Sequence, residues 1–196
     1  MDEGKILLVN LSKGKIGEIN SNLLGMIITG KLQMSAFARA DMVDQNARRD
    51  FYLYIDEFQN FTTDSISTIL SEARKFRLNL IIAHQFVAQL TDKIRDAVFG
   101  NVGSMISFRI GVQDAEKIVK QFEPAFNQND LINIDNLNAY VRLLISGETS
   151  RPFNIKVPIL YMNNPEYAAK LKEINSLKYG RPRAEVEAKV YARLRG

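Results

Sequence analysis

The chain has 196 residues, contains no cysteine and carries a net charge of +4 with a pI near 9.2. The absence of cysteine excludes disulfides, thiolate metal sites and a cysteine nucleophile, so a reducing, cytoplasmic environment is expected. No segment reaches the ~18 consecutive apolar residues of a membrane span, and residues 1–5 lack the pattern of a signal peptide.

The N-terminal region is expected to form a strand, a basic loop and a long helix. Residues 5–11 are almost continuously apolar, which predicts a buried strand, and residues 12–17 are rich in glycine and lysine, which predicts a loop. From Asn20 or Ser21, either of which can cap a helix, apolar residues recur at helical spacing to about Ala40.

Residues 25–31 of this helix have the glycine and lysine spacing of a phosphate-binding P-loop. However, Leu32 stands where a P-loop has the serine or threonine that binds Mg²⁺, and no strand runs into this segment. We therefore interpret these residues as an ordinary part of the helix. The chain then holds a candidate second half of a nucleotide site without a convincing first half.

The apolar run from Phe51 to Ile55 predicts a strand buried on both faces of a parallel sheet, and it ends in Asp56 and Glu57. Open α/β sheets bind ligands at the carboxyl edge of their strands. At that edge one carboxylate can hold a hydrated Mg²⁺ and the other can polarise an attacking water. The alternative is an aspartate that caps the next helix beside a solvated glutamate.

A polar connector, residues 41–50, precedes this strand, and a helix that runs to about residue 77 is predicted to follow it. The residues that can cap this helix are Thr62, Thr63 and Asp64. Its last turn holds the bases Arg74, Lys75 and Arg77. Positive charge at this place favours the helix dipole, which is the structural interpretation of these bases.

Residues 78–83 predict a second buried strand, which ends in His84 and Gln85. Because parallel strands end at a common edge, Gln85 is expected near Asp56 and Glu57. His84 is the only histidine, so we prefer a hydrogen-bonded residue at a strand end to a metal ligand or a catalytic dyad.

The remaining elements are predicted from apolar spacing and from turn residues. They are a helix from Thr91 or Asp92 through Val98, a turn at 100–103, a strand at 104–110, a helix from Gln113 or Asp114 to Pro124, a hairpin of 139–146 and 149–157 with its turn at 147–148, and charged helices at 165–178 and 183–195.

Four of these segments carry a family resemblance when they are taken in order. They are the strand ending in Asp56-Glu57, the helix ending Glu72-Ala73-Arg74-Lys75-Phe76, the strand ending Ala83-His84-Gln85, and Gly100-Asn101-Val102-Gly103-Ser104. Over residues 5–157 the chain resembles the C-terminal half of HerA/FtsK-type motor ATPases. It looks most like the conjugative coupling proteins of type IV secretion, the TraG/TraD type.

The resemblance implies an α/β fold of the RecA-like, P-loop NTPase type, with a mostly parallel sheet flanked by helices. Residues 1–160 would form the C-terminal part of the motor domain, without the P-loop strand but with a C-terminal hairpin. Residues 161–196 would add an extension of two charged helices.

The resemblance also implies roles in ATP hydrolysis with Mg²⁺ as cofactor. Asp56 would be the Walker B carboxylate that holds Mg²⁺ through water, and Glu57 would be the base that activates the attacking water. Gln85 would be the sensor of the γ-phosphate, and Arg74 would be an arginine finger that reaches a neighbouring subunit's nucleotide.

Such motors are hexameric rings that move DNA through a central pore. They work in the cytoplasm, and other parts of the protein can hold them at the inner face of the membrane beside the secretion machinery. Because the P-loop strand and its lysine are missing here, the chain is either part of a longer protein or a degenerate relative. In either case we expect the isolated chain to be inactive as an ATPase.

Two other functions are compatible with the sequence. The chain can be a catalytically silent interaction module that binds DNA or secretion partners through its basic surface. It can also be a free-standing Mg²⁺-dependent hydrolase that uses Asp56 and Glu57, although the sequence places no further acidic ligand beside them.

The missing P-loop strand leads to an expectation about the sheet. In a RecA-like domain this strand lies between the two strands predicted at 79–84 and 104–110, and unpaired buried backbone groups are costly. We expect these two strands to pair directly. The alternatives are insertion of another segment, such as part of the 139–157 hairpin, and pairing with a second chain. If the two strands lay in separate sheets, that would contradict the RecA-like assignment.

Overall fold

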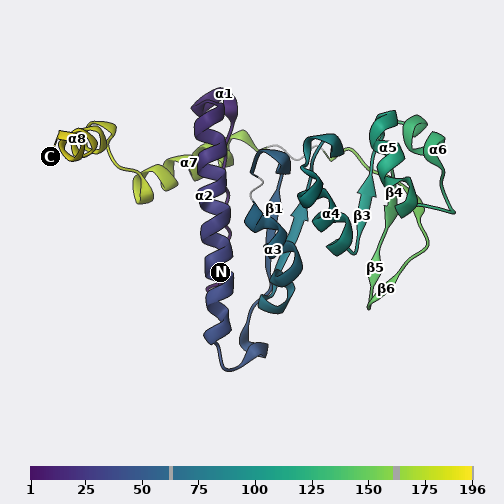
Figure 1. Cartoon of the computed structure of the whole chain (residues 1–196). Coiled ribbons are helices and arrows are strands. Elements are labelled where there is room, and N and C mark those ends of the chain that lie inside the picture. The colour runs from purple at the N-terminus through teal and green to yellow at the C-terminus, as the bar shows by residue number, and fades with distance from the viewer. Residues whose placement is uncertain (62–63, 161–163, 196) are drawn as a thin grey trace. The chain divides into compact units, whose positions relative to one another are not determined.

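The computed structural model describes residues 1–61, 64–160 and 164–195, and it divides into two compact units, residues 1–157 and 158–196 (Figure 1). The first unit contains all the described strands, and the second contains two helices. The helix cap candidates Thr62 and Thr63 lie outside the described residues. The fold is mixed α/β.

The N-terminal prediction of a strand is wrong. Residues 5–11 belong to none of the sheets of the described structure, and Ile6 is 88% exposed. An apolar run forms a strand only where a neighbouring strand accepts its hydrogen bonds, and here the segment lies beside a sheet without pairing to it.

The long helix is confirmed. A short helix α1 (Lys13–Ile16) leads into α2 (Glu18–Phe37), which begins two residues before the predicted cap. Ser21 is buried and its hydroxyl donates to the carbonyl of Leu11 at 2.5 Å, which ties the helix to the preceding segment. Residues 25–31 are helical throughout, and Gly25 lies against the ring of Phe61.

Two 3-10 turns, η1 (Ala38–Asp41) and η2 (Gln45–Ala47), form the polar connector. The buried arginines Arg39 and Arg48 extend from this region and donate to the carbonyls of Phe76 and Lys75. These bonds satisfy carbonyl groups at the end of a helical segment, where intrahelical partners are lacking.

The central strand pair has the predicted direction. Strands β1 (Phe51–Ile55) and β2 (Leu78–Ile82) are parallel, with Phe51 opposite Leu78 and Ile55 opposite Ile82. The connection contains η3 (Phe58–Phe61), α3 (Asp64–Glu72) and η4 (Ala73–Phe76). The core beside the pair includes Phe58, Ile66, Ile69, Ala73 and Leu78.

The expectation that β1 is covered on both faces is wrong. Tyr52 and Tyr54 are 57% and 72% exposed, whereas Ile55 is buried. The alternate side chains of a strand point to opposite faces, and the described residues leave one of these faces largely uncovered.

The rest of the first unit includes a three-stranded sheet and a two-stranded sheet. It contains η5 (Val87–Gln89), α4 (Asp92–Asn101), β3 (Met105–Ser107), α5 (Val112–Ile118), η6 (Val119–Gln121), α6 (Gln128–Asn133), β4 (Asn138–Arg142), β5 (Leu144–Ile145), β6 (Glu148–Thr149) and β7 (Phe153–Lys156). Strands β5 and β6 form an antiparallel pair, and the three-stranded sheet is antiparallel with the order β3-β4-β7. A second core beside it includes Ala115, Ile118, Phe122 and Leu131.

Three local expectations in this region need correction. Helix α4 runs to Asn101, so Gly100 lies inside the helix. The strand predicted at 104–110 has only three residues. The turn between β5 and β6 is Ser146-Gly147, because both residues have positive φ and Ile145 pairs with Glu148. This turn is the two-residue type in which both central residues have positive φ.

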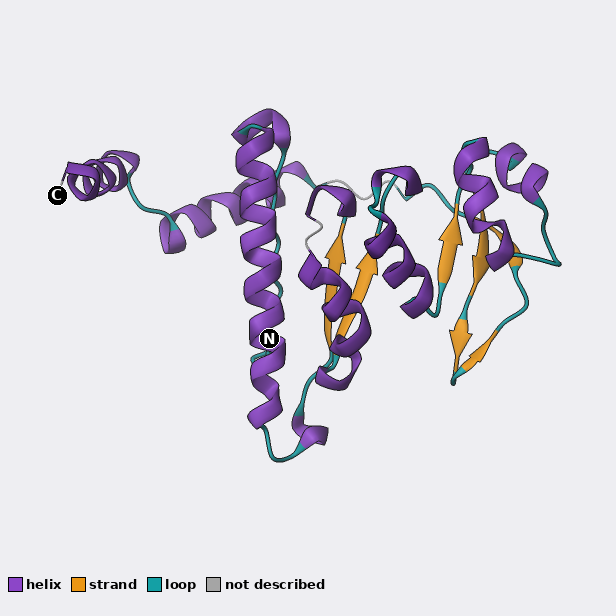
Figure 2. Ribbon diagram, viewed as in Figure 1, coloured by secondary structure: helices purple, strands orange, loops and turns teal. Residues whose placement is uncertain are grey.

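The expected pairing of 79–84 with 104–110 is also wrong. Figure 2 shows β1 and β2 side by side, and β3 belongs to the three-stranded, antiparallel sheet. The described strands therefore form three small sheets, and the continuous, mostly parallel sheet expected for a RecA-like domain is not observed, which counts against the RecA-like assignment.

The second unit contains the two predicted charged helices, α7 (Pro165–Tyr179) and α8 (Arg183–Arg195). The Asn164 side chain caps α7 by accepting from the backbone N–H of Tyr167 at 3.0 Å. All residues of both helices are exposed. Among the described helices, none has the length and the apolar character to cross a bilayer.

Two glycines of α2 provide a test of the packing. A Cβ at Gly25 would overlap the Phe61 ring, so Gly25→Ala should destabilise the protein by about 1–3 kcal/mol. A Cβ at Gly30 meets nothing within 4 Å, so Gly30→Ala should stabilise the helix by roughly 0.5–1 kcal/mol. Urea denaturation of both variants measures these changes, and equal stabilities would contradict the described packing.

Candidate functional site

A groove of about 1210 Å³ runs between the N-terminal segment, α2 and β1. Much of its length is apolar and includes Leu8, Ile28, Tyr52 and Tyr54. One end is polar and is lined by Asn10, Ser12, Lys13, Asp56, Glu57 and Asn60. This polar end lies at the carboxyl end of β1, where the sequence predicted a site.

The backbone holds Glu57 at this end through a tight turn. Glu57 has φ of 51°, in the left-handed region that few residues other than glycine adopt. Its N–H donates to Oδ1 of Asp56 at 3.0 Å. The next N–H, of Phe58, donates to the carbonyl of Ala83 at 2.9 Å, and the N–H of Ala83 donates to the carbonyl of Ile55 at 2.9 Å. The turn is therefore tied to the end of β2.

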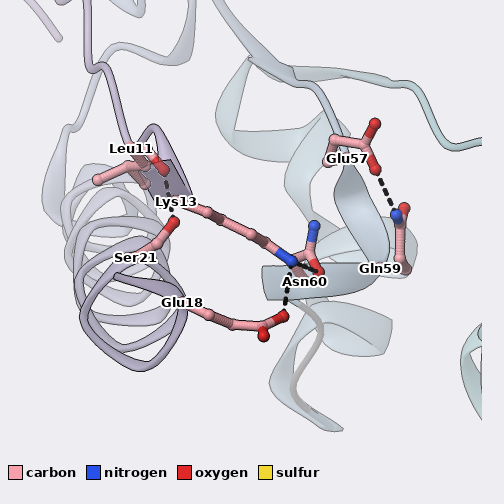
Figure 3. Close-up of polar contacts among 7 residues, drawn as sticks. All are labelled: Leu11, Lys13, Glu18, Ser21, Glu57, Gln59 and Asn60. Carbon is pink, nitrogen blue, oxygen red and sulfur yellow. Dashed lines mark hydrogen bonds and ion pairs between the residues drawn. The ribbon is translucent and has the colours of Figure 1, made fainter. Parts of the chain in front are cut away.

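The structure brings Glu57 and Gln85 together. Nε2 of Gln85 donates to Oε1 of Glu57 at 2.6 Å, and Nε2 of Gln59 donates to Oε2 at 2.5 Å (Figure 3 shows the contact with Gln59). Asp56 is exposed beside them. Three of the four predicted site residues thus lie at one edge of the β1-β2 pair.

Arg74 lies at the other end of the same strands. It lines a separate pocket of about 360 Å³ with Lys75, Arg77, Asp50 and Asn79. Asp50 directly precedes β1, and a five-residue strand spans about 16 Å, so Arg74 does not reach Glu57 within this chain.

Lys13 is a site residue that the sequence reasoning missed. Its Nζ donates to Oε1 of Glu18 at 2.8 Å and to Oδ1 of Asn60 at 3.0 Å (Figure 3). The hydrogen bond and the positive charge of Lys13 lower the pKa of the Glu18 carboxyl. The sequence signal was the basic loop at 12–17, which follows an apolar run just as Asp56 and Glu57 do.

Asp56 and Glu57 are better suited to a metal ion that binds together with a phosphate substrate than to a metal ion held by protein ligands alone. Among the described residues, no group of three or more His, Cys, Asp or Glu side chains could hold a metal ion. Mg²⁺ in phosphate-transfer sites uses one or two carboxylates together with waters and substrate phosphates. Asp56 fits this donor set because it is exposed and lines the groove.

His84 lies next to Gln85 and is half-buried. Burial lowers the pKa of its imidazole, and the negative charge of Asp114 partly opposes this effect. Asp114 is itself buried, and its Oδ2 accepts from the backbone N–H of Val87 at 3.2 Å.

No protein-family model matches the chain, and no curated protein matches it in sequence.

The pKa of His84 leads to a prediction about stability. Because the folded-state pKa lies below the ordinary value of 6.5, the unfolded chain takes up the proton first as the pH falls. His84 should therefore lower the free energy of unfolding as the pH drops below about 6.5. Urea titrations between about pH 5 and 7.5 should show this slope in the wild type and a smaller one in His84→Gln. Equal slopes in the two proteins would contradict the assignment of this pH dependence to His84.

Proposed function

We propose that this chain is the C-terminal part of a RecA-like motor domain in a DNA-translocating ATPase similar to the type IV secretion coupling proteins. The contact between Glu57 and Gln85 carries this proposal. It joins a carboxylate and an amide at the carboxyl ends of two adjacent parallel strands, which is where α/β folds of this class bind nucleotides.

The side chains at this edge fit the roles that ATP hydrolysis requires. Mg²⁺, when bound with the nucleotide, neutralises phosphate charge, and Asp56 is the carboxylate that would hold it. Glu57 would take the proton from the attacking water at a carboxylate oxygen. The amide of Gln85 orients Glu57 in the described structure and would contact the terminal phosphate once a nucleotide is bound.

The separation of β2 and β3 into different sheets counts against a RecA-like sheet within this chain, so the proposal requires that a further strand joins their open edges. Among the described strands, β2 pairs with β1 alone and β3 pairs with β4 alone. Direct pairing of β2 and β3 is absent in the described part of the chain, so a RecA-like sheet would require a further strand between them. A P-loop strand from another segment would pair with both edges and would also bring the phosphate-binding lysine.

The position of Arg74 is compatible with an action between subunits. Its pocket lies at the end of the strands away from Glu57, so any contact of Arg74 with a nucleotide would be made in a neighbouring subunit of a ring. A hexameric ring on the cytoplasmic side of the membrane, beside secretion machinery, is the assembly that the family resemblance suggests.

The distribution of charge supports DNA as the partner. Residues 158–196 contain eight Lys and Arg against four Asp and Glu, whereas residues 1–157 contain 18 of each. The net positive charge therefore belongs to the C-terminal unit, whose helix residues are all exposed. This observation also favours the second candidate function, a catalytically silent module that binds DNA or secretion partners.

The first test measures ATP hydrolysis by this chain and by a version joined at its N-terminus to a P-loop segment. The isolated chain should neither turn over ATP nor bind Mg·ATP in the low micromolar range, because the Gly-rich loop provides most of the phosphate affinity. In the joined protein, Glu57→Gln should keep nucleotide binding and lower turnover about 10²–10⁴-fold. Low-micromolar binding to the chain alone, or an active Glu57→Gln enzyme, would refute the proposal.

The second test concerns Arg74 in the joined protein. Arg74→Ala should lower turnover, since an arginine finger is worth ~10³–10⁵ in rate. Mixing Arg74→Ala subunits with Glu57→Gln subunits should restore part of the activity, because some interfaces then combine an intact Glu57 with an intact Arg74. Lys75→Ala is the matched control. If Arg74→Ala hydrolysed ATP at the normal rate, Arg74 would not be an arginine finger, and the helix-dipole interpretation of this residue would hold.

A further inference from the structure

The ammonium group of Lys13 has one hydrogen-bond donor to spare at the polar end of the groove. A lysine ammonium has three N–H donors, and the contacts with Glu18 and Asn60 use two of them. The side chain is 43% exposed and lines the groove together with Asp56 and Glu57. The third donor can therefore bind a ligand in the groove while both existing contacts persist.

The negative charges at the polar end of the groove would repel a polyphosphate unless a cation were also present. A polyphosphate that approaches Asp56 and Glu57 meets two carboxylates, and Glu18 adds a third beside Lys13. The lysine of the P-loop-like segment, Lys31, lies within α2 and does not line the groove. Among the residues that form the polar end, Lys13 is the one that offers a positive charge.

We propose that Lys13 is a phosphate-binding residue of this site, which contacts the polyphosphate of a Mg·nucleotide. The identity of the ligand rests on the proposed function, but the contact itself depends only on the position of Lys13. Exposed ion pairs are weak, so the bond from Lys13 to Glu18 can also be exchanged for a bond to phosphate at little cost.

The link to Asn60 gives this contact a second effect. Asn60 lies in η3, which begins directly after Glu57, and the N–H of Asn60 donates to the carbonyl of Glu57 at 2.9 Å. A phosphate held by Lys13 would therefore be connected through Asn60 to the turn that orients Glu57. Lys13 acts in this way as a ligand contact and as a link between the N-terminal segment and the carboxylates.

The test uses this chain and Mg·tripolyphosphate, a probe that has the phosphates of ATP without its base. Nuclear magnetic resonance follows the Lys13 ammonium and the amides of Glu57 and Asn60 during a titration into the millimolar range. The wild type should show shifts at these groups. Lys13→Met should weaken the binding about tenfold, which is the effect of losing one charge-assisted hydrogen bond, and Lys13→Arg should retain most of it.

Two controls separate binding from structure. Lys15→Met removes a positive charge from the same short helix, α1, at a position that does not line the groove, so its affinity should equal that of the wild type. Glu18→Gln breaks the same ion pair but keeps Lys13, so its affinity should be unchanged or higher. The inference is overturned if no group shifts, if Lys13→Met and Lys15→Met behave alike, or if Glu18→Gln loses binding as Lys13→Met does.

These results are independent of the test of the proposed function. If the joined protein fails to hydrolyse ATP while Lys13 binds tripolyphosphate, the motor proposal is wrong and the phosphate site remains. If Glu57→Gln behaves as predicted while Lys13→Met binds normally, the motor proposal remains and the assignment of Lys13 is wrong.

Discussion

The site depends on the parallel pairing of β1 with β2 and on the backbone bonds that continue it past the ends of both strands. The N–H of Ala83 donates to Ile55, and the N–H of Phe58 donates back to Ala83. Between these two bonds the chain has room for only Asp56 and Glu57, so both carboxylates must leave the sheet there. Without this pairing Gln85 would not be placed beside Glu57.

The same pairing explains which parts of the structure were predictable from the sequence. Strands β1 and β2 and helix α2 follow from apolar spacing, which acts over a few residues, and the two C-terminal helices follow from charged segments on either side of a turn at 179–182. The meeting of Glu57 with Gln85 follows from one further rule, that parallel strands end at a common edge. These features depend on local pattern and on a single pairing.

The failures have a different physical origin. Residues 5–11 have the composition of a strand but lack a paired neighbour, and composition cannot reveal whether a neighbour is present. The predictions that β1 is covered on both faces and that residues 79–84 pair with 104–110 were wrong for the same reason. Both arrangements require segments that are far away in the sequence. Lys13 was missed because its partner Asn60 is 47 positions away along the chain. Helix α6 was missed although Asn127 and Asp130 form a capping box, which is a local signal.

The left-handed backbone of Glu57 has a consequence for how this turn is maintained. A residue with a side chain in that conformation costs of order 1–3 kcal/mol, and glycine would relieve the cost. A glycine at this position would also remove the carboxylate, and with it the hydrogen bonds from Gln85 and Gln59. The cost of the backbone at Glu57 is therefore coupled to the contact that joins the ends of β1 and β2.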